Sequence, residues 1–129
     1  MAGERILVVD DNPTNSKLAR LMLQAEGYDV RTAPDAERAL ELIDEYEPRL
    51  VLMDIQLPGM NGLELTRRIK SSERFRHLPI LALTAYAMAG DEARALAAGC
   101  DGFLAKPVDM TTLPRAVATI LDGRPERPR

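Results

Sequence analysis

The sequence predicts an α/β fold with an open, doubly wound sheet of five parallel strands. Short hydrophobic runs alternate along the chain with longer segments of helical periodicity, which is typical of repeated strand–helix units. The runs are almost continuously apolar, as expected for strands covered by helices on both faces. Five units are too few to close an eight-stranded barrel, so the sheet must remain open. Right-handed crossovers then favour the flavodoxin-like strand order 2-1-3-4-5.

The first two strand–helix units can be placed from their hydrophobic runs and caps. Residues 6–9 form the first predicted strand, and the first helix is expected to begin after Asn12, which can cap it, and to end at Gly27. The predicted apolar face of this helix consists of Leu18, Leu21, Met22 and Ala25. A short strand around Val30 follows, and Asp35 is expected to cap the second helix. The predicted face of that helix consists of Ala36, Ala39, Leu40 and Ile43.

Three further units complete the predicted sheet. Residues 50–53 form the third strand, and after the turn signal at 58–62 a helix is expected from about Leu63 to Ser71. Residues 79–84 form the fourth strand, followed by a helix over 91–98. The fifth strand covers 103–105, and the last helix carries the apolar residues Leu113, Val117, Ile120 and Leu121. We therefore expect one domain over residues 1–122 and a disordered C-terminal tail over residues 123–129.

Composition narrows the class of protein. The chain has 129 residues, of which 46% are hydrophobic and 29% charged, and its formal net charge is −3. Such a balance gives no reason to expect binding to nucleic acid or to an anionic membrane. No apolar run approaches the length needed to span a bilayer, and the N-terminus lacks a signal-peptide pattern. The single cysteine, Cys100, excludes an internal disulfide, so we expect a cytoplasmic protein.

Polar side chains stand where four of the predicted strands end. These side chains are Asp10, Asp11, Asp54, Thr84 and Lys106. Each alone has a structural explanation, such as a helix cap, a turn hydroxyl or a solvated cation, but the carboxyl ends of parallel strands share one edge, where such folds bind ligands. Acids this close repel one another unless a cation lies between them, and Mg²⁺ prefers oxygen ligands. A carboxylate can act as nucleophile without a general base, and Lys106 and Thr84 suit a phosphoryl group.

The motifs at these strand ends resemble those of response-regulator receiver domains, the family of the chemotaxis regulator CheY, over residues 4 to about 122. The matching motifs are Val8-Val9-Asp10-Asp11-Asn12, Met53-Asp54-Ile55-Gln56-Leu57-Pro58-Gly59-Met60-Asn61-Gly62, Leu83-Thr84-Ala85 and Lys106-Pro107. Residues 11–15 and 84–92 also resemble two subgroups, single-domain regulators similar to DivK and the receivers attached to hybrid histidine kinases.

The resemblance implies a role for each residue of the cluster. Asp54 would accept a phosphoryl group from a phosphohistidine of a sensor histidine kinase or a histidine phosphotransfer protein. Asp10 and Asp11 would hold Mg²⁺, together with Asp54 and the backbone carbonyl of Gln56. Thr84 and Lys106 would bind the phosphoryl group, and the Lys106–Pro107 peptide bond would be cis.

The resemblance also implies a switch and an output surface. Phosphorylation would draw Thr84 inward and admit the ring of Phe103 into the vacated space. Gln56 and Tyr86 would flank the water that attacks the phosphoryl group, and the bulk of Tyr86 predicts a phosphoryl lifetime of minutes or longer. A downstream protein would bind the face formed by the fourth helix, fifth strand and fifth helix.

Three functions follow from these expectations. The first is a stand-alone two-component signalling switch without a DNA-binding output domain, which catalyses only its own phosphorylation and dephosphorylation and is otherwise not an enzyme. The second is a phosphorelay intermediate or a receiver module excised from a hybrid histidine kinase. The third is a phosphatase of the haloacid-dehalogenase type, which is disfavoured because Gln56 stands where that class requires a second aspartate.

Overall fold

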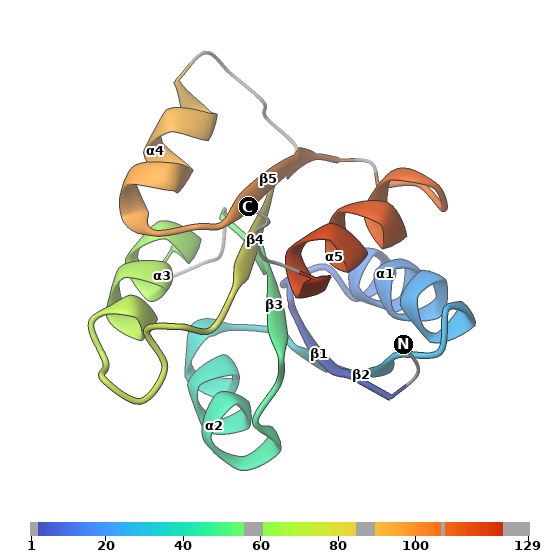
Figure 1. Cartoon of the computed structure of the whole chain (residues 1–129), viewed down its shortest axis with the longest axis horizontal. Helices are drawn as coiled ribbons and strands as arrows, with labels where there is room; N and C mark the ends of the chain where they lie inside the picture. The colour runs from blue at the N-terminus through green and yellow to red at the C-terminus, as the bar shows by residue number, and fades with distance from the viewer. Residues whose placement is uncertain (1–2, 56–60, 85–89, 107, 123–129) are drawn as a thin grey trace.

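Five strands and five helices alternate along the chain (Figure 1). The structure is a computed structural model, and it describes residues 3–55, 61–84, 90–106 and 108–122. The strands are β1 (Arg5–Val9), β2 (Asp29–Ala33), β3 (Leu50–Asp54), β4 (Ile80–Thr84) and β5 (Gly102–Ala105). The helices are α1 (Pro13–Ala25), α2 (Ala36–Tyr46), α3 (Gly62–Lys70), α4 (Asp91–Ala98) and α5 (Thr112–Asp122).

The strands form one parallel sheet in the order β2-β1-β3-β4-β5, which confirms the predicted topology. The crossovers on the two sides of β1 run in opposite directions, so β1 and β3 lie side by side at the topological switch point. Val9 pairs with Met53 across these two strands. The residues that follow the pair, Asp10 and Asp54, are therefore brought to the same edge of the sheet.

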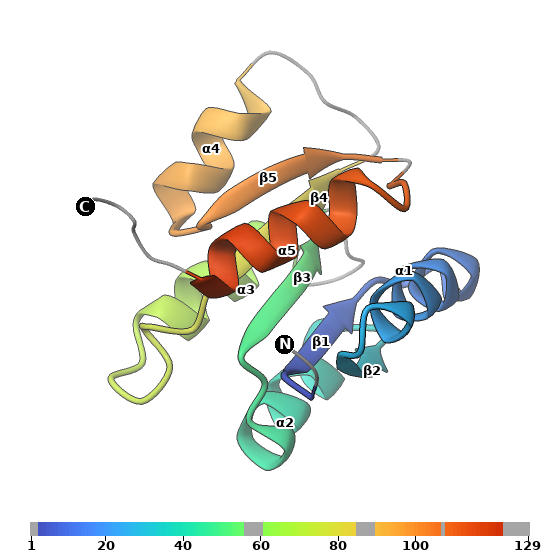
Figure 2. The same ribbon diagram turned by 45° about the vertical axis from the view of Figure 1, so that its right-hand side comes forward.

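Helices cover both faces of the sheet, as Figures 1 and 2 show. One face packs against α1 and α5 through residues that include Ala19, Leu23 and Val117. The other face packs against α2, α3 and α4 through residues that include Ile43 and Leu65. Each strand contributes alternate side chains to the two core layers. This double coverage explains why the strand sequences are apolar without alternation.

Side-chain caps fix the starts of the helices that follow β1, β2 and β3. The Asn12 side chain accepts hydrogen bonds from the backbone N–H groups of Thr14 at 2.9 Å and Asn15 at 3.1 Å. Asp35 and Asn61 cap α2 and α3 in the same way. The predicted caps Asn12 and Asp35 are confirmed. They hold the first turns of α1 and α2 close to the carboxyl edge of the sheet.

The predicted face of α1 was wrong in three of its four residues. Leu18 and Leu21 are 43% and 49% exposed, and Ala25 is also exposed, whereas Met22 is buried. The residues that α1 buries are Ser16, Ala19, Met22 and Leu23. With this stripe facing the sheet, the Ser16 hydroxyl donates a hydrogen bond to the Asp10 carbonyl at 3.2 Å. Larger aliphatic side chains are consequently left on the surface of α1.

The remaining element boundaries agree closely with the prediction. Helix α4 covers the predicted residues and ends at Gly99, whose φ of 113° lies in the left-handed region. The C-terminal tail and the predicted cis Lys106–Pro107 bond lie outside the described residues. Among the described residues, none of the helices has the length and apolar character needed to cross a membrane.

Candidate functional site

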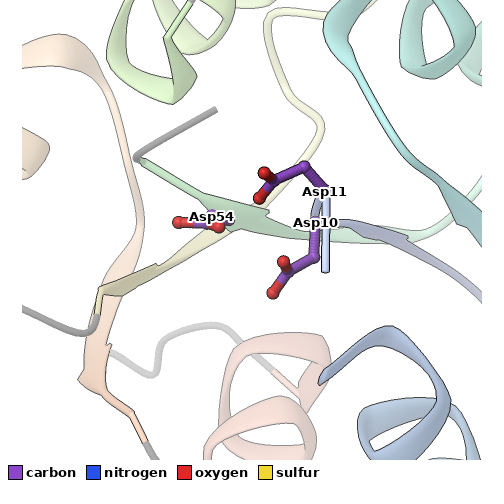
Figure 3. A group of neighbouring side chains, drawn as sticks. All are labelled: Asp10, Asp11 and Asp54. Carbon is purple, nitrogen blue, oxygen red and sulfur yellow. The ribbon is translucent and has the colours of Figure 1, made fainter. Parts of the chain in front are cut away.

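Three carboxylates meet at the adjoining ends of β1 and β3. Asp54 is the last residue of β3, and Asp10 and Asp11 directly follow β1. One carboxylate oxygen from each of the three lies within 4.8 Å of the other two. Figure 3 shows the Asp10 and Asp11 carboxylates extending toward the side on which Asp54 lies. Asp10 and Asp54 are each only 3% exposed, whereas Asp11 is exposed, so the cluster opens to solvent on the Asp11 side.

Lys106 forms ion pairs with two of these carboxylates and comes from the end of an outer strand of the sheet. It follows β5, and its Nζ lies 2.8 Å from Asp10 Oδ2 and 3.2 Å from Asp54 Oδ2. Burial lowers the pKa of the Lys106 ammonium, but hydrogen bonding to Asp10 and the charges of Asp54 and Asp10 outweigh it, so the pKa is raised above its ordinary value. Lys106 therefore stays charged and partly neutralises the cluster.

Thr84 lies between the acids and Lys106 in the order of strands. It is the last residue of β4 and is fully buried, and its backbone carbonyl accepts a hydrogen bond from the Lys106 N–H at 2.7 Å. Strand β4 pairs with β3 through Asp54 and Leu83, so Thr84 follows the partner of Asp54. The structure thus brings all five predicted strand-end residues to one edge.

Two residues that the sequence reasoning did not assign to the site hold Asp10 in place. The Asn12 N–H donates to Asp10 Oδ1 at 2.9 Å, and the Ser16 hydroxyl donates to the Asp10 carbonyl. Asn12 was predicted only as a helix cap. Ser16 precedes Ala19 and Leu23 by three and seven residues, so its helical spacing from these small and apolar residues was the available signal for its burial.

Other predicted site residues are placed less completely. Phe103 lies on β5, is partly buried and packs against the core layer beneath α2, α3 and α4. Gln56 and Tyr86 lie outside the described residues. The predicted carbonyl ligand of Gln56, and the predicted positions of both residues beside the attacking water, therefore stay predictions.

The donor set suits a hard divalent cation. Mg²⁺ prefers oxygen ligands and is usually bound through one or two carboxylates with several waters retained. Three carboxylates offer oxygen atoms within 4.8 Å of one another, and two of these carboxylates are buried. They could bind one side of the ion and leave its other side to water. A cavity of about 310 Å³ opens beside Asp10 and Asp11, and Lys17 and Arg20 contribute to its lining. This cavity lies on the side of α1 and β2 and reaches Asp10 and Asp11, so these two carboxylates are accessible to an ion.

The chain is similar in sequence to known signalling proteins. The family described as the response regulator receiver domain matches residues 6–118. The polar-differentiation response regulator DivK of Brucella ovis is 43% identical over 115 residues, which are 89% of this chain and 91% of that protein. DivK of Brucella anthropi is 42% identical over the same shares of both chains.

Solved structures of similar shape include further response regulators. A response regulator of Chloroflexus aurantiacus superposes with a TM-score of 0.90 at 34% identity, covering 94% of this chain and 99% of that one. The chemotaxis protein CheY4 of Vibrio cholerae gives a TM-score of 0.85 at 28% identity over 91% and 98% of the two chains. The BeF3-activated receiver domain of Klebsiella pneumoniae RstA gives 0.86 at 28% identity over 93% and 100%.

Proposed function

Because the chain belongs to the response regulator receiver domain family, we propose that it is a signalling switch in which Asp54 accepts a phosphoryl group from a phosphohistidine. The observation that carries this proposal is the position of the Lys106 ammonium. It contacts both Asp10 and Asp54, while Asp11 completes the acidic cluster beside them. One buried carboxylate is thereby held beside a fixed cation at the edge where such sheets bind ligands.

Asp54 suits the role of nucleophile. A carboxylate can act as a nucleophile without a general base. One of its oxygens would form a bond to phosphorus as the bond from phosphorus to the donor imidazole nitrogen breaks, and the released imidazole takes a proton from solvent. Lys106 would neutralise charge on the transferred oxygens, and the Thr84 hydroxyl would donate a hydrogen bond to one of them. The donor would approach from the side of Asp11, which is the exposed member of the cluster.

Asp10, Asp11 and Asp54 would hold Mg²⁺ on that open side. When bound, the ion supplies positive charge to phosphoryl oxygens that the single ammonium of Lys106 does not neutralise. The hydrogen bonds from Asn12 and Ser16 to Asp10 would keep this ligand oriented before the ion arrives.

The surface of α1 supports docking of the phosphohistidine donor beside the site. Leu18 and Leu21 are exposed one turn apart, and Leu18 and Val108 line a small cavity together with Asp10 and Lys106. Exposed aliphatic side chains next to a reactive centre are typical of a protein–protein contact. We propose that a helical histidine kinase or histidine phosphotransfer protein covers this surface during transfer.

The output would be a change in protein–protein binding and not the turnover of a separate substrate. Phe103 on β5 and the exposed Ala93, Leu96 and Ala97 of α4 offer a surface to a downstream protein on the face of α4, β5 and α5. The chain would act in the cytoplasm, where the kinase domains that generate phosphohistidine have access to ATP.

Phosphoryl transfer to the Asp54→Asn variant tests the proposal. The parent chain, incubated with Mg²⁺ and either phosphoramidate or a panel of autophosphorylated histidine kinases, should gain one phosphoryl group by intact-mass measurement. Asp54→Asn should gain none, and chelation of Mg²⁺ with EDTA should abolish the gain in the parent. Glu73→Gln, which changes an exposed acid in the α3–β4 connection, is the matched control and should behave as the parent. Equal labelling of Asp54→Asn and the parent would refute the assignment.

A further inference from the structure

The first residue of α3 touches the backbone of the phosphoacceptor strand. Gly62 is buried, and its N–H donates a hydrogen bond to the Ile55 carbonyl at 3.3 Å. A Cβ atom built on Gly62 would lie 2.4 Å from the Asp54 carbonyl oxygen and 2.6 Å from the Ile55 Cα. The optimal separation of nonbonded carbon atoms is about 3.5–4.0 Å. Distances of 2.4 Å and 2.6 Å are therefore severe overlaps.

The overlapped atoms distinguish Gly62 from the other glycines packed in the fold. A Cβ on Gly102 would lie 2.9 Å from Leu81 Cδ1 and 3.1 Å from Ile120 Cδ1. Those atoms are the ends of side chains, which can rotate away. The atoms that a Cβ on Gly62 would meet belong to the main chain of Asp54 and Ile55, so a side chain there must displace either β3 or α3.

The start of α3 is held firmly enough that β3 would share the displacement. Asn61 caps the helix by accepting from the Glu64 N–H at 2.9 Å. The buried Thr66 hydroxyl donates to the Gly62 carbonyl at 2.8 Å, and Leu65 and Ile69 are buried in the core. Moving α3 outward would break these contacts. The end of β3 is held as well, because the Ile55 N–H donates to the Leu83 carbonyl at 3.0 Å. A side chain at Gly62 would therefore press two fixed segments apart, and the Asp54 backbone would take part of the displacement.

We infer that Gly62 is a positioning residue for the reaction at Asp54: the absence of a side chain lets α3 rest directly on the Asp54–Ile55 backbone and fixes the Asp54 carboxylate relative to Asp10, Asp11 and Lys106. The inference rests on the proposed function of Asp54. A displacement of the reacting group by about 1 Å is enough to cost on the order of 100-fold in rate.

Gly62→Ala tests the inference, with Gly102→Ala as the matched control. Both variants add one methyl group to a packed glycine, and both should lower the urea midpoint. Under conditions where each variant is folded by circular dichroism, Gly62→Ala should accept phosphate from phosphoramidate about 10-fold to 100-fold more slowly than the parent. Its Mg²⁺ dissociation constant, from isothermal titration, should rise by about 10-fold. Gly102→Ala should stay within about twofold of the parent in both measurements.

The outcomes separate this inference from the proposed function. If the parent itself accepts no phosphate on Asp54, the proposed function fails whatever Gly62→Ala does. If the parent accepts phosphate and Gly62→Ala matches it in rate and Mg²⁺ affinity, the positioning role alone is wrong. If Gly102→Ala loses as much activity as Gly62→Ala, the loss reflects stability and the inference is overturned.

A milder pair of variants keeps the test decisive if Gly62→Ala does not fold. Thr66→Val preserves side-chain shape but cannot donate to the Gly62 carbonyl, whereas Thr66→Ser keeps the hydroxyl. We expect the Mg²⁺ dissociation constant to rise about 2-fold to 5-fold in Thr66→Val, as the first turn of α3 loosens, and to return toward the parent value in Thr66→Ser. An unchanged Mg²⁺ affinity in folded Thr66→Val would then count against the inference.

Discussion

Lys106 is the residue on which the electrostatics of the site depend. Burying two carboxylates near one another is unfavourable unless a cation compensates them. The Lys106 ammonium contacts both Asp10 and Asp54. Lys106 follows β5, which is separated from β3 by β4, the strand that ends in Thr84. One cation therefore holds together an edge built from β1, β3 and β5. Asp11 is the exposed member of the cluster, so its negative charge faces solvent.

The strand-end residues could be predicted individually, while their supporting contacts could not. Asp10, Asp54, Thr84 and Lys106 each end an apolar run, and parallel strands must bring their carboxyl ends together. The hydrogen bond from Ser16 to Asp10 depends on the rotation of α1 about its axis. That rotation is set by packing, for which the sequence carries only a weak signal.

Tyr46 gives a pH-dependent contribution to stability that is remote from the site. Its hydroxyl donates to the Asp29 carbonyl at 2.8 Å, and the Arg31 guanidinium lies 4.6 Å from the ring centroid. Burial, together with the negative charge of Asp29, raises the pKa of Tyr46 to about 12, although Arg31 and Arg5 lower it in part. The folded protein therefore retains the phenol proton at pH values where the unfolded chain has lost it.

Tyr46→Phe tests this contribution. The raised pKa stabilises the parent fully below pH 10, the ordinary value for tyrosine, and the stabilisation is lost as the pH rises toward 12. At pH 8 we expect the parent to be more stable than Tyr46→Phe by about 1 kcal/mol, through the hydrogen bond to Asp29. By pH 11 the parent should have lost about 1.4 kcal/mol relative to the variant. Urea unfolding at both pH values measures the difference, and a constant difference would show that the phenol titrates normally.

At the scale of the element, helix boundaries were more predictable than helix rotation. Asn12, Asp35 and Gly99 cap or end their helices as expected, because capping depends on residues close in sequence. The buried face of α1 depends on contacts with β1 and β2. Leu18 and Leu21 suggested one face, but tertiary packing buries Ser16, Ala19, Met22 and Leu23 instead.

The C-terminus of α2 contains a strained residue that offers an opportunity to stabilise the fold. Among the described residues other than glycine, Glu47 alone has a positive φ, which is 53°. Its N–H donates to the Ile43 carbonyl at 3.2 Å, as a left-handed helix cap requires. Its carboxylate pairs with Arg74 at 3.3 Å, but the pair is exposed and Arg74 also contacts Asp44. The backbone conformation should therefore outweigh the ion pair.

Glu47→Gly should raise the free energy of unfolding by about 0.5–1 kcal/mol. Glycine adopts the left-handed conformation without steric cost, and the lost exposed ion pair is worth little. Glu41→Gly places the same substitution at an exposed position inside α2 and should instead lower stability by about 1 kcal/mol. Urea titrations of the three proteins measure both effects. A variant at position 47 that is less stable than the parent would mean that the ion pair with Arg74 outweighs the backbone strain.

At the scale of the whole molecule, the strand order was predictable because each connection is short and contains one helix. Five such units with right-handed crossovers leave few arrangements, and the flavodoxin-like order among them places the first and third strands side by side. The close approach of Gly62 to Asp54 was not predictable in the same way. Gly62 stands in a dense turn motif, and nothing in the sequence separates a turn glycine from one required by backbone contact.

The free energy of unfolding of the whole domain should depend on Mg²⁺, because the acidic cluster is assembled only in the folded state. Without the ion, three carboxylates lie within reach of one another and a single ammonium offsets them, so the native state carries unfavourable repulsion. The unfolded chain separates these charges. A bound cation reverses the balance, because it binds the folded protein and not the unfolded one.

Asp11→Asn should therefore change the sign of its effect with Mg²⁺. In EDTA, removal of the exposed charge should raise the free energy of unfolding by about 0.5–1 kcal/mol. At a Mg²⁺ concentration ten times its dissociation constant, the parent should gain about 1.4 kcal/mol, and Asp11→Asn, which lacks one ligand charge, should gain much less. The order of stability then reverses. Urea unfolding at constant ionic strength measures both conditions, with Glu73→Gln as the control that should show no reversal. A parent whose stability does not respond to Mg²⁺, or an Asp11→Asn variant that gains as much as the parent, would contradict an ion held by this carboxylate.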